Sequence, residues 1–261
     1  MSNAEPIPAA TVLLLRDKPA FEVLMVERNQ AVGFAGGALV FPGGRIAPGD
    51  SHQAWFRHAR GLAPEADIAA AQVAAIRETF EEAGVLLARH KGHDDFISGE
   101  EAESFQDWRL KVEADDALFL ELIKMANLEL APDALCFFAR WIAPKGIHKR
   151  FDTWFFAART PTSQQVREDG SEATEAVWIN PTKALQCRDD KTRKIIFPTA
   201  CNLQLLAQRD SVEATFSFAK SRKIEPITPI IVQKGRQAFL QIPDDLGYPV
   251  TEENLEGMER G

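Results

Sequence analysis

Residues 71–85, with the sequence AQVAAIRETFEEAGV, are the stretch around which the rest of the chain is organised. At 3.6 residues per turn, Val73, Ile76 and Phe80 lie on one face, which predicts an amphipathic helix packed on a core. Gly84 is the residue type that most readily ends a helix in the left-handed conformation. We therefore predict a helix over this stretch that stops at Gly84.

Three glutamates of this helix crowd a neighbouring face. Glu81 and Glu82 follow Glu78 by three and four positions, which is about one helical turn. Their carboxylates therefore lie close to that of Glu78 and repel it. The helix macrodipole also opposes anions near a C-terminus, and Arg77 can neutralise only part of the charge. Mg²⁺ and Mn²⁺ prefer carboxylate oxygens, so the run predicts a metal platform. The alternative is a charged helix face in contact with water.

The amino-acid sequence of this stretch resembles a known motif. Arg77–Val85 is similar to the second half of the Nudix box, REUxEExGU, in which U is apolar. The first half resembles Phe41–Arg45 (FPGGR), followed by Asp50 at the spacing at which the family has glutamate. Residues 51–76 separate the halves, so the box is split. This arrangement is similar to the branch of Nudix proteins that includes the peroxisomal acyl-CoA diphosphatases.

The resemblance implies an α/β protein with the Nudix fold, a mixed β-sheet sandwiched between α-helices. We expect residues 1–261 to form a single enlarged Nudix domain. Its additions to the core would be a split-box insertion at about 51–70, a helical insertion at about 92–131, and C-terminal helices with a hairpin at about 182–247.

The activity implied by the resemblance is metal-dependent hydrolysis of a phosphoanhydride bond in a nucleoside diphosphate derivative. The split box favours CoA or acyl-CoA as the substrate. ADP-ribose, NAD(H) and dinucleoside polyphosphates remain alternatives within the same fold. A catalytically weak Nudix-like module that only binds a nucleotide is an alternative of a different class.

The resemblance also assigns roles to residues. The metal ligands would be Glu78, Glu81 and Glu82, joined by the carbonyl of Gly43, with Mg²⁺ or Mn²⁺ as the cofactor. Arg77 would orient the glutamates through paired hydrogen bonds, because a guanidinium group matches carboxylate geometry. We count Arg77 and Glu81 among the catalytic residues.

Six other positions are candidates for the rest of the expected site. Glu172, six residues before Trp178, is the candidate for activating water, and Glu175 competes with it for that role. Asp50 is shorter than the family's glutamate and is expected outside the direct metal ligands. Arg28, Arg45 and Arg150 are the expected substrate-binding residues. For Arg150, the alternative is that it only helps to solubilise a basic hairpin tip.

Composition limits the classes of partner. The 261 residues carry a net charge of −8 and 45% hydrophobic residues, which argues against a nucleic-acid surface. Three scattered cysteines without a CxxC pair favour a reducing, cytoplasmic location. No apolar run is long enough to span a bilayer, and no signal segment is recognised at the N-terminus. The expected partner is a small nucleoside diphosphate substrate, and a homodimer contact through the inserted or C-terminal segments is an open expectation.

Apolar and alternating runs predict the remaining elements. Strands are expected at Ala10–Leu15, Phe21–Glu27, Ala38–Phe41, Ala134–Ile142, Phe151–Arg159 and Ala176–Ile179, with a terminal hairpin from Pro229–Gln233 and Gln237–Ile242. A pair of helices is expected between Glu101 and Asn127, where core packing and a substrate lid are both open as roles. Asp67 is the expected N-cap of the first helix. The acidic tail after Tyr248 is expected to fray.

Overall fold

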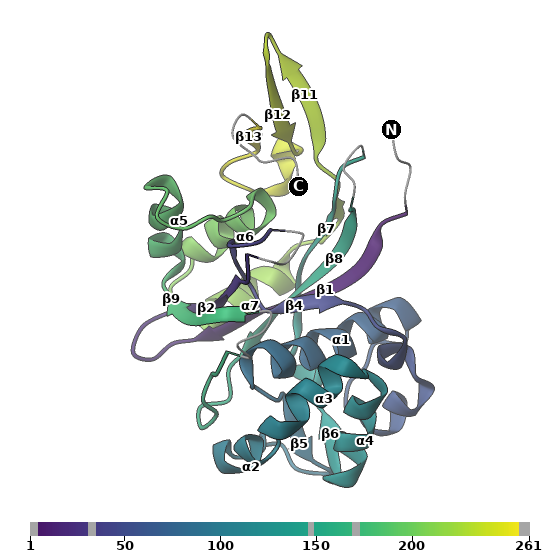
Figure 1. The fold of residues 1–261 in the computed structure, drawn as a ribbon. Coiled ribbons are helices and arrows are strands. Elements are labelled where there is room, and N and C mark those ends of the chain that lie inside the picture. Colours follow the sequence, from purple (N-terminus) through teal and green to yellow (C-terminus); the bar gives the residue numbers. More distant parts are fainter. Residues whose placement is uncertain (1–4, 31–34, 146–148, 169–172, 256–261) are drawn as a thin grey trace.

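The computed structural model describes residues 5–30, 35–145, 149–168 and 173–255, and a mixed β-sheet forms its centre (Figure 1). The strands of this sheet run in the order β10-β7-β8-β1-β2-β3, while β4 pairs with β1 and β9 pairs with β2. Their bounds are β1 Ile7–Arg16, β2 Glu22–Arg28, β3 Leu39–Val40, β4 Gly43–Arg45, β7 Cys136–Ile142, β8 Phe151–Arg159, β9 Ala173–Ile179 and β10 Pro226–Ile227.

Strand β1 lies at the centre of the sheet and runs parallel to β8. Their register extends from Ile7 opposite Phe151 to Leu15 opposite Arg159. The β7–β8 pair is antiparallel, as the sequence predicted. Alternate side chains of β1 enter two different hydrophobic cores, one on each face of the sheet. This double burial explains why β1 reads as a continuous apolar run rather than an alternating one.

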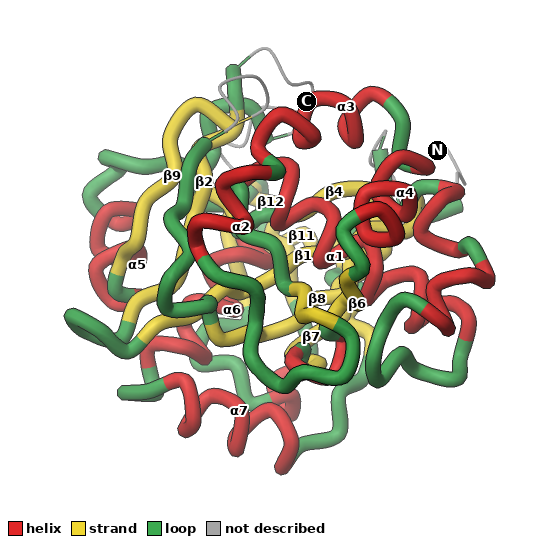
Figure 2. The backbone as a smooth tube through the Cα atoms, turned by 90° about the horizontal axis from the view of Figure 1, so that it is seen from below, coloured by secondary structure: helices red, strands yellow, loops and turns green. Residues whose placement is uncertain are grey.

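Helices cover both faces of the sheet. On one face lie α1 Ala66–Ala83, α2 Gly99–Ser104, α3 Arg109–Ala114 and α4 Ala117–Met125, which Figure 2 views from their own side. On the other lie α5 Pro181–Asp189, α6 Phe197–Ala207 and α7 Val212–Ser221. The layered arrangement agrees with the α/β class expected from the sequence.

Helix α1 confirms the prediction from residues 71–85 and starts earlier. Gly84 ends it in the left-handed conformation with φ of 69°. The expected N-cap was wrong, because Glu65 occupies that position and Asp67 lies within the first helical turn. There the Asp67 carboxylate lies near the positive end of the helix dipole, where a negative charge is favourable without a capping hydrogen bond.

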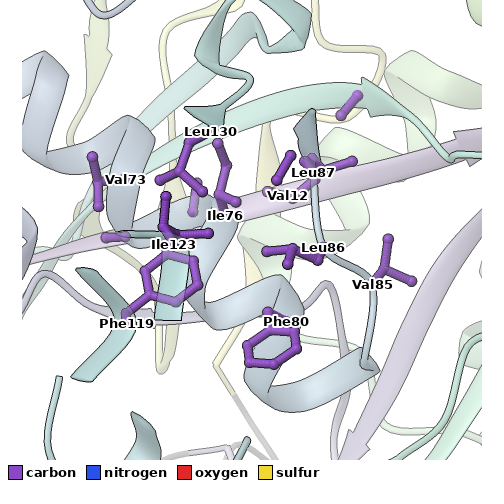
Figure 3. Packing of buried hydrophobic residues seen from close by; sticks show 14 of the residues in the cluster. Val12, Val73, Ile76, Phe80, Val85, Leu86, Leu87, Phe119, Ile123 and Leu130 are labelled. Carbon is purple, nitrogen blue, oxygen red and sulfur yellow. The ribbon is translucent and has the colours of Figure 1, made fainter. Parts of the chain in front are cut away.

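The helical insertion expected at about 92–131, called the inserted segment below, packs directly on α1. Figure 3 shows Val73 and Ile76 of α1 beside Phe119 and Ile123 of α4. The rings of Phe80 and Phe119 stack with centroids 6.1 Å apart. Short strands β5 Ala88–His90 and β6 Leu128–Leu130 pair antiparallel and bring the two ends of the segment together. Core packing, one of the two roles left open for this segment, is therefore observed.

The inserted segment contains three short α-helices rather than the expected pair. A 3₁₀ turn, Gln106–Trp108, separates α2 from α3. Between α3 and α4, Asp115 adopts an extended backbone, and its carboxylate accepts a hydrogen bond from the Ala117 N–H at 3.1 Å. An aspartate that bonds the backbone two residues ahead favours a turn over a continuous helix, and it separates the two predicted helices, while the 3₁₀ turn divides the first of them.

The C-terminal region forms a separate three-stranded sheet. Strands β11 Ile230–Lys234 and β12 Gln237–Gln241 confirm the predicted hairpin, which projects from the body in Figure 1. The expected fraying after Tyr248 was wrong for β13 Glu252–Asn254, which pairs with β12. Acidic residues are poor strand formers, so this pairing depends on the neighbouring strand. In the described ranges, no helix combines the length and apolar character needed to cross a membrane.

Candidate active site

The glycine turn of β4 lies against the acidic face of α1. The Gly43 N–H donates to Glu82 Oε2 at 3.0 Å. A Cβ at Gly44 would lie 2.5 Å from Glu78 Oε1, and a Cβ at Gly43 would lie 2.4 Å from the carbonyl oxygen of Ala10. Only glycine permits this close approach of backbone to carboxylate. The two glycines therefore allow the helix and the turn to form one site.

Arg77 joins the two halves of the split motif. Its Nε and Nη2 each donate to one carboxylate oxygen of Asp50 at 2.9 Å. Its Nη1 donates to Glu81 Oε1 at 2.9 Å and lies 3.0 Å from Glu78 Oε1. Its Nη2 also donates to the Arg45 carbonyl at 2.9 Å. The side chain was expected to orient the glutamates, and it also anchors the 3₁₀ turn that follows β4.

Asp50 is the principal partner of Arg77. Asp50 is only 3% exposed, and its Oδ2 also accepts a hydrogen bond from the Ala47 N–H at 2.8 Å. Both oxygens of this carboxylate accept hydrogen bonds, from the Arg77 guanidinium and the Ala47 amide, so Asp50 holds these two groups in place. This arrangement agrees with the expectation that Asp50 lies outside the direct metal ligands. The paired geometry itself was not predicted.

The acidic cluster, defined as Asp50, Glu78, Glu81 and Glu82, is buried. Burial raises the pKa of Glu78 to about 8, although the charge of Arg77 acts in the opposite direction. Burial likewise raises the pKa values of Glu81 and Asp50. Desolvation penalises each charged carboxylate, so these groups hold their protons to higher pH than exposed carboxyl groups do, unless further positive charge is brought beside them.

Two arginines supply the positive charge near this cluster. Burial alone would lower the pKa of Arg77, but its hydrogen bond to Asp50 and the surrounding carboxylates raise it above its ordinary value. Arg77 therefore stays protonated. Arg28, at the end of β2, has its Nη1 3.9 Å from Glu82 Oε1. Among the described residues, the guanidinium groups of Arg77 and Arg28 thus lie beside carboxyl groups of the acidic cluster.

The donor chemistry of the cluster fits a hard divalent cation, because buried carboxylates in excess are the ligands such ions prefer. Among the residues that the structure describes, no three acidic, histidine or cysteine side chains are grouped so as to hold a metal ion. Glu81 is engaged by Arg77, and Glu82 by the Gly43 N–H. Metal binding would therefore exchange these hydrogen bonds for bonds to the cation.

The three arginines expected to bind substrate differ in position. Arg28 lies beside the acidic cluster, and Arg45 adjoins it through its backbone while its side chain is exposed. Arg150 is buried at the start of β8, where Nε donates to the Ala143 carbonyl at 3.0 Å. The structure thus places two of the three at the cluster and anchors the third to the β7–β8 connection.

Of the two candidates for activating water, the structure describes Glu175 only. Glu172 lies outside the described residues. Glu175 belongs to β9, and its Oε2 lies 2.7 Å from Arg193 Nη1, which also pairs with Glu27. The carboxylate of Glu175 is therefore engaged in an ion pair with an arginine of another segment.

Sequence reasoning did not single out Arg109, which also contacts the acidic helix. Arg109 belongs to α3, and its Nε and Nη2 donate to the Glu81 carbonyl at 2.9 and 2.7 Å. The available signal was the three-residue spacing between Arg109 and the buried Val112, which places both on the inward face of a predicted helix. The identity of the acceptor could not be read from that spacing.

Known proteins resemble this chain in sequence and in fold. A family model described as the NUDT19 Nudix domain matches residues 58–206, more than half of the 261 residues, including all of α1. The match begins after the Gly43–Gly44 turn. An acyl-coenzyme A diphosphatase NUDT19 from Xenopus laevis is 28% identical over 276 residues, covering 88% of this chain and 72% of that protein.

Two further comparisons agree. An acyl-coenzyme A diphosphatase NUDT19 from Homo sapiens is 27% identical over 290 residues, covering 93% of this chain and 77% of the human protein. A crystal structure of a NUDIX hydrolase from Alicyclobacillus acidocaldarius matches with a TM-score of 0.69 and 27% sequence identity. It covers 83% of this chain and 97% of the solved one. The fold is thus similar to that of a Nudix hydrolase along most of the chain.

Proposed function

Since this chain belongs to the NUDT19 Nudix domain family and is a Nudix-type diphosphatase, we propose that it hydrolyses the phosphoanhydride bond of CoA or acyl-CoA in a metal-dependent reaction. The substrate class follows from the names of the Xenopus and human relatives, which are acyl-coenzyme A diphosphatases. Cleavage of CoA would yield a 3′-phosphorylated AMP and a 4′-phosphopantetheine product.

The single observation that carries the catalytic reading is the contact set of Arg77. One buried guanidinium binds Asp50 from the first half of the motif and Glu81 from the second. A helix with a solvated acidic face does not need this arrangement, because its carboxylates would face water. The contact set supports a built site in which two distant segments hold the glutamates at defined positions.

The proposed metal ligands are Glu78, Glu81 and Glu82 with the Gly43 carbonyl. When bound, Mg²⁺ or Mn²⁺ supplies positive charge that offsets the phosphate oxygens and assists the activation of water. Arg77 holds Glu81 in position by hydrogen bonding. All three glutamates project from the last two turns of α1, so one rigid helix sets their relative positions.

The remaining steps fall to groups around the cluster. Arg28 and Arg45 bind the diphosphate oxygens, because guanidinium groups pair well with phosphate. Glu172 accepts the proton of the attacking water. As the water oxygen bonds to one phosphorus, the bridging P–O bond breaks, and the departing phosphate keeps the bonding electron pair. Arg150 is the third proposed anion contact, from the β7–β8 connection.

ADP-ribose, NAD(H) and dinucleoside polyphosphates are alternative substrates within the same reaction class. A nucleotide-binding module with little activity is the alternative of another class, and the presence of all three helix glutamates and Arg77 weighs against it. A single domain over residues 1–261, a homodimer and a cytoplasmic location remain predictions. Light scattering of the purified chain tests the oligomeric state.

The test of this function is product analysis by mass spectrometry in ¹⁸O-labelled water, with Mg²⁺ and with Mn²⁺. The panel contains CoA, acetyl-CoA, a medium-chain acyl-CoA, ADP-ribose, NADH and diadenosine polyphosphates. We expect the CoA species to be cleaved fastest, with the label on one phosphate product. Faster cleavage of ADP-ribose or a dinucleotide would refute the substrate assignment, and no cleavage under either metal would favour the binding module.

A further inference from the structure

A buried arginine of the inserted segment closes the C-terminal end of α1. Arg109 is 7% exposed, and its Nε and Nη2 both donate to the Glu81 carbonyl. The last carbonyls of a helix have no partner within the helix, and they carry its partial negative charge. The guanidinium therefore satisfies a carbonyl of the same residue whose side chain binds Arg77.

The same guanidinium reaches two other segments. Its Nη2 donates to the Arg167 carbonyl at 2.9 Å, and its Nη1 donates to Gln106 Oε1 at 3.0 Å. The Arg167 N–H in turn donates to the Ala83 carbonyl at 3.0 Å. One side chain thus connects the end of α1, the turn before α3, and the segment that follows β8.

A second contact from the inserted segment reaches the other half of the site. The carboxylate of Asp116, which precedes α4, accepts a hydrogen bond from the Gly49 N–H. Gly49 is followed by Asp50, the bidentate partner of Arg77. The indole Nε1 of Trp55 also donates to the Gly49 carbonyl at 2.8 Å. The inserted segment therefore holds the 3₁₀ turn of Asp50 as well as the last turn of α1.

From these contacts we propose that the helical insertion positions the acidic cluster, with Arg109 as the positioning residue for Glu81 and Asp116 as its counterpart for Asp50. This inference rests on the proposed function. Two parallel N–H donors on one carbonyl restrict the last helical turn, which otherwise frays. A displacement of about 1 Å at a catalytic group can reduce a rate by about a hundredfold. The insertion serves the reaction from outside the substrate path, through the backbone of α1.

Arg109→Lys is the test variant, because lysine keeps the charge and loses the paired donors. Arg89→Lys is the matched control. Arg89 is 8% exposed, and its guanidinium binds Asp133 and packs over Phe96 rather than over the end of α1. We expect Arg109→Lys to lower kcat by about tenfold or more with KM nearly unchanged. Arg89→Lys should leave kcat within about twofold of wild type at a similar loss of melting temperature.

A chemical rescue separates the guanidinium from a general effect on folding. A cavity of about 240 Å³ beside Arg109 is lined also by Gln106, Leu110 and Arg167. Free guanidinium should therefore reach the vacated position in Arg109→Ala and restore part of kcat. Ethylammonium, which lacks the planar pair of donors, should restore less. If Arg109→Ala does not fold, the comparison of the two lysine variants carries the test.

Amide hydrogen exchange over residues 78–85 supplies a readout that does not depend on activity. We expect faster exchange there in Arg109→Lys than in Arg89→Lys. If wild type cleaves no substrate while this exchange difference is present, the proposed function fails and the positioning role stands. If wild type is active and the two lysine variants match in kcat and in exchange, the positioning role is refuted.

Discussion

Arg77 and Asp50, 27 residues apart, form a bidentate ion pair at 2.9 Å for both hydrogen bonds, and this pair unites a motif that the sequence divides. The inserted residues between them do not disturb the geometry, because β4 and α1 are both held against β1. The acidic cluster is therefore assembled from two segments in space. The residues inserted between the two halves of the motif are tolerated because the chain leaves the site after β4 and comes back to it in α1.

Removing Asp50 should destabilise the protein strongly. Asp50→Ala leaves Arg77 buried beside fewer carboxylates, and breaking one side of a buried pair costs about 3 to 5 kcal/mol in the free energy of unfolding. Urea unfolding at pH 7 measures the change. Glu121→Gln, which breaks the exposed pair with Lys124, should cost less than about 0.5 kcal/mol. Equal costs for the two variants would contradict the structural role of Asp50.

A methyl group at Gly44 should disturb Glu78. The Cβ in Gly44→Ala would lie 2.5 Å from Glu78 Oε1, so the carboxylate must move. We expect kcat to fall by about tenfold or more, because the moved group is a proposed metal ligand. A double-mutant cycle with Glu78→Gln measures the coupling. Additive effects of the two substitutions on kcat would show that Gly44 acts through some other contact.

Divalent metal should stabilise the folded protein. A cation that binds the native cluster at 100 times its Kd adds about 2.7 kcal/mol to the free energy of unfolding. Differential scanning fluorimetry with Mg²⁺ and Mn²⁺, and with EDTA as the control, should show a higher melting temperature with metal. The shift should shrink in Glu82→Gln. A shift of the same size in that variant would place the metal elsewhere.

Arg45 offers a test of substrate binding that leaves the core intact. Its side chain is exposed, while its backbone carbonyl accepts a hydrogen bond from Arg77. Arg45→Ala should raise KM for CoA by about tenfold, near the lower end of the value of one charge-assisted hydrogen bond, with little change in melting temperature. Arg57→Ala, at another exposed arginine, is the control. An unchanged KM in Arg45→Ala would remove Arg45 from the substrate contacts.

The parts of the fold that sequence predicted well are those governed by local pattern. The structure confirms two such predictions within one helix. The apolar face of α1 includes Val73, Ile76 and Phe80, and the helix ends at Gly84. Six strands of the central sheet were likewise recognised from apolar runs, whereas the short strands β4 and β10 were not predicted. The placement of the glycine turn beside the acidic face was implied by the resemblance to the Nudix box rather than by a local pattern, because Gly43 and Glu82 are 39 residues apart.

The parts that could not be predicted depend on partners distant in sequence. Arg109 meets the Glu81 carbonyl only because α3 packs on α1, and no local pattern specifies an acceptor 28 residues away. The division of the insertion into three helices depends on the 3₁₀ turn Gln106–Trp108 within the first predicted helix, and β13 depends on the edge offered by β12. Glu172 lies outside the described residues, so its role stays a prediction.

The most direct test of the central claim is the kcat of Glu82→Gln on CoA with saturating Mg²⁺, measured beside its melting temperature without metal. Glutamine keeps the size of the side chain and removes its charge. The account predicts a loss of about a hundredfold or more in kcat, with a melting temperature close to that of wild type. A near-normal kcat in this folded variant would contradict the assignment of the acidic cluster as the catalytic metal site.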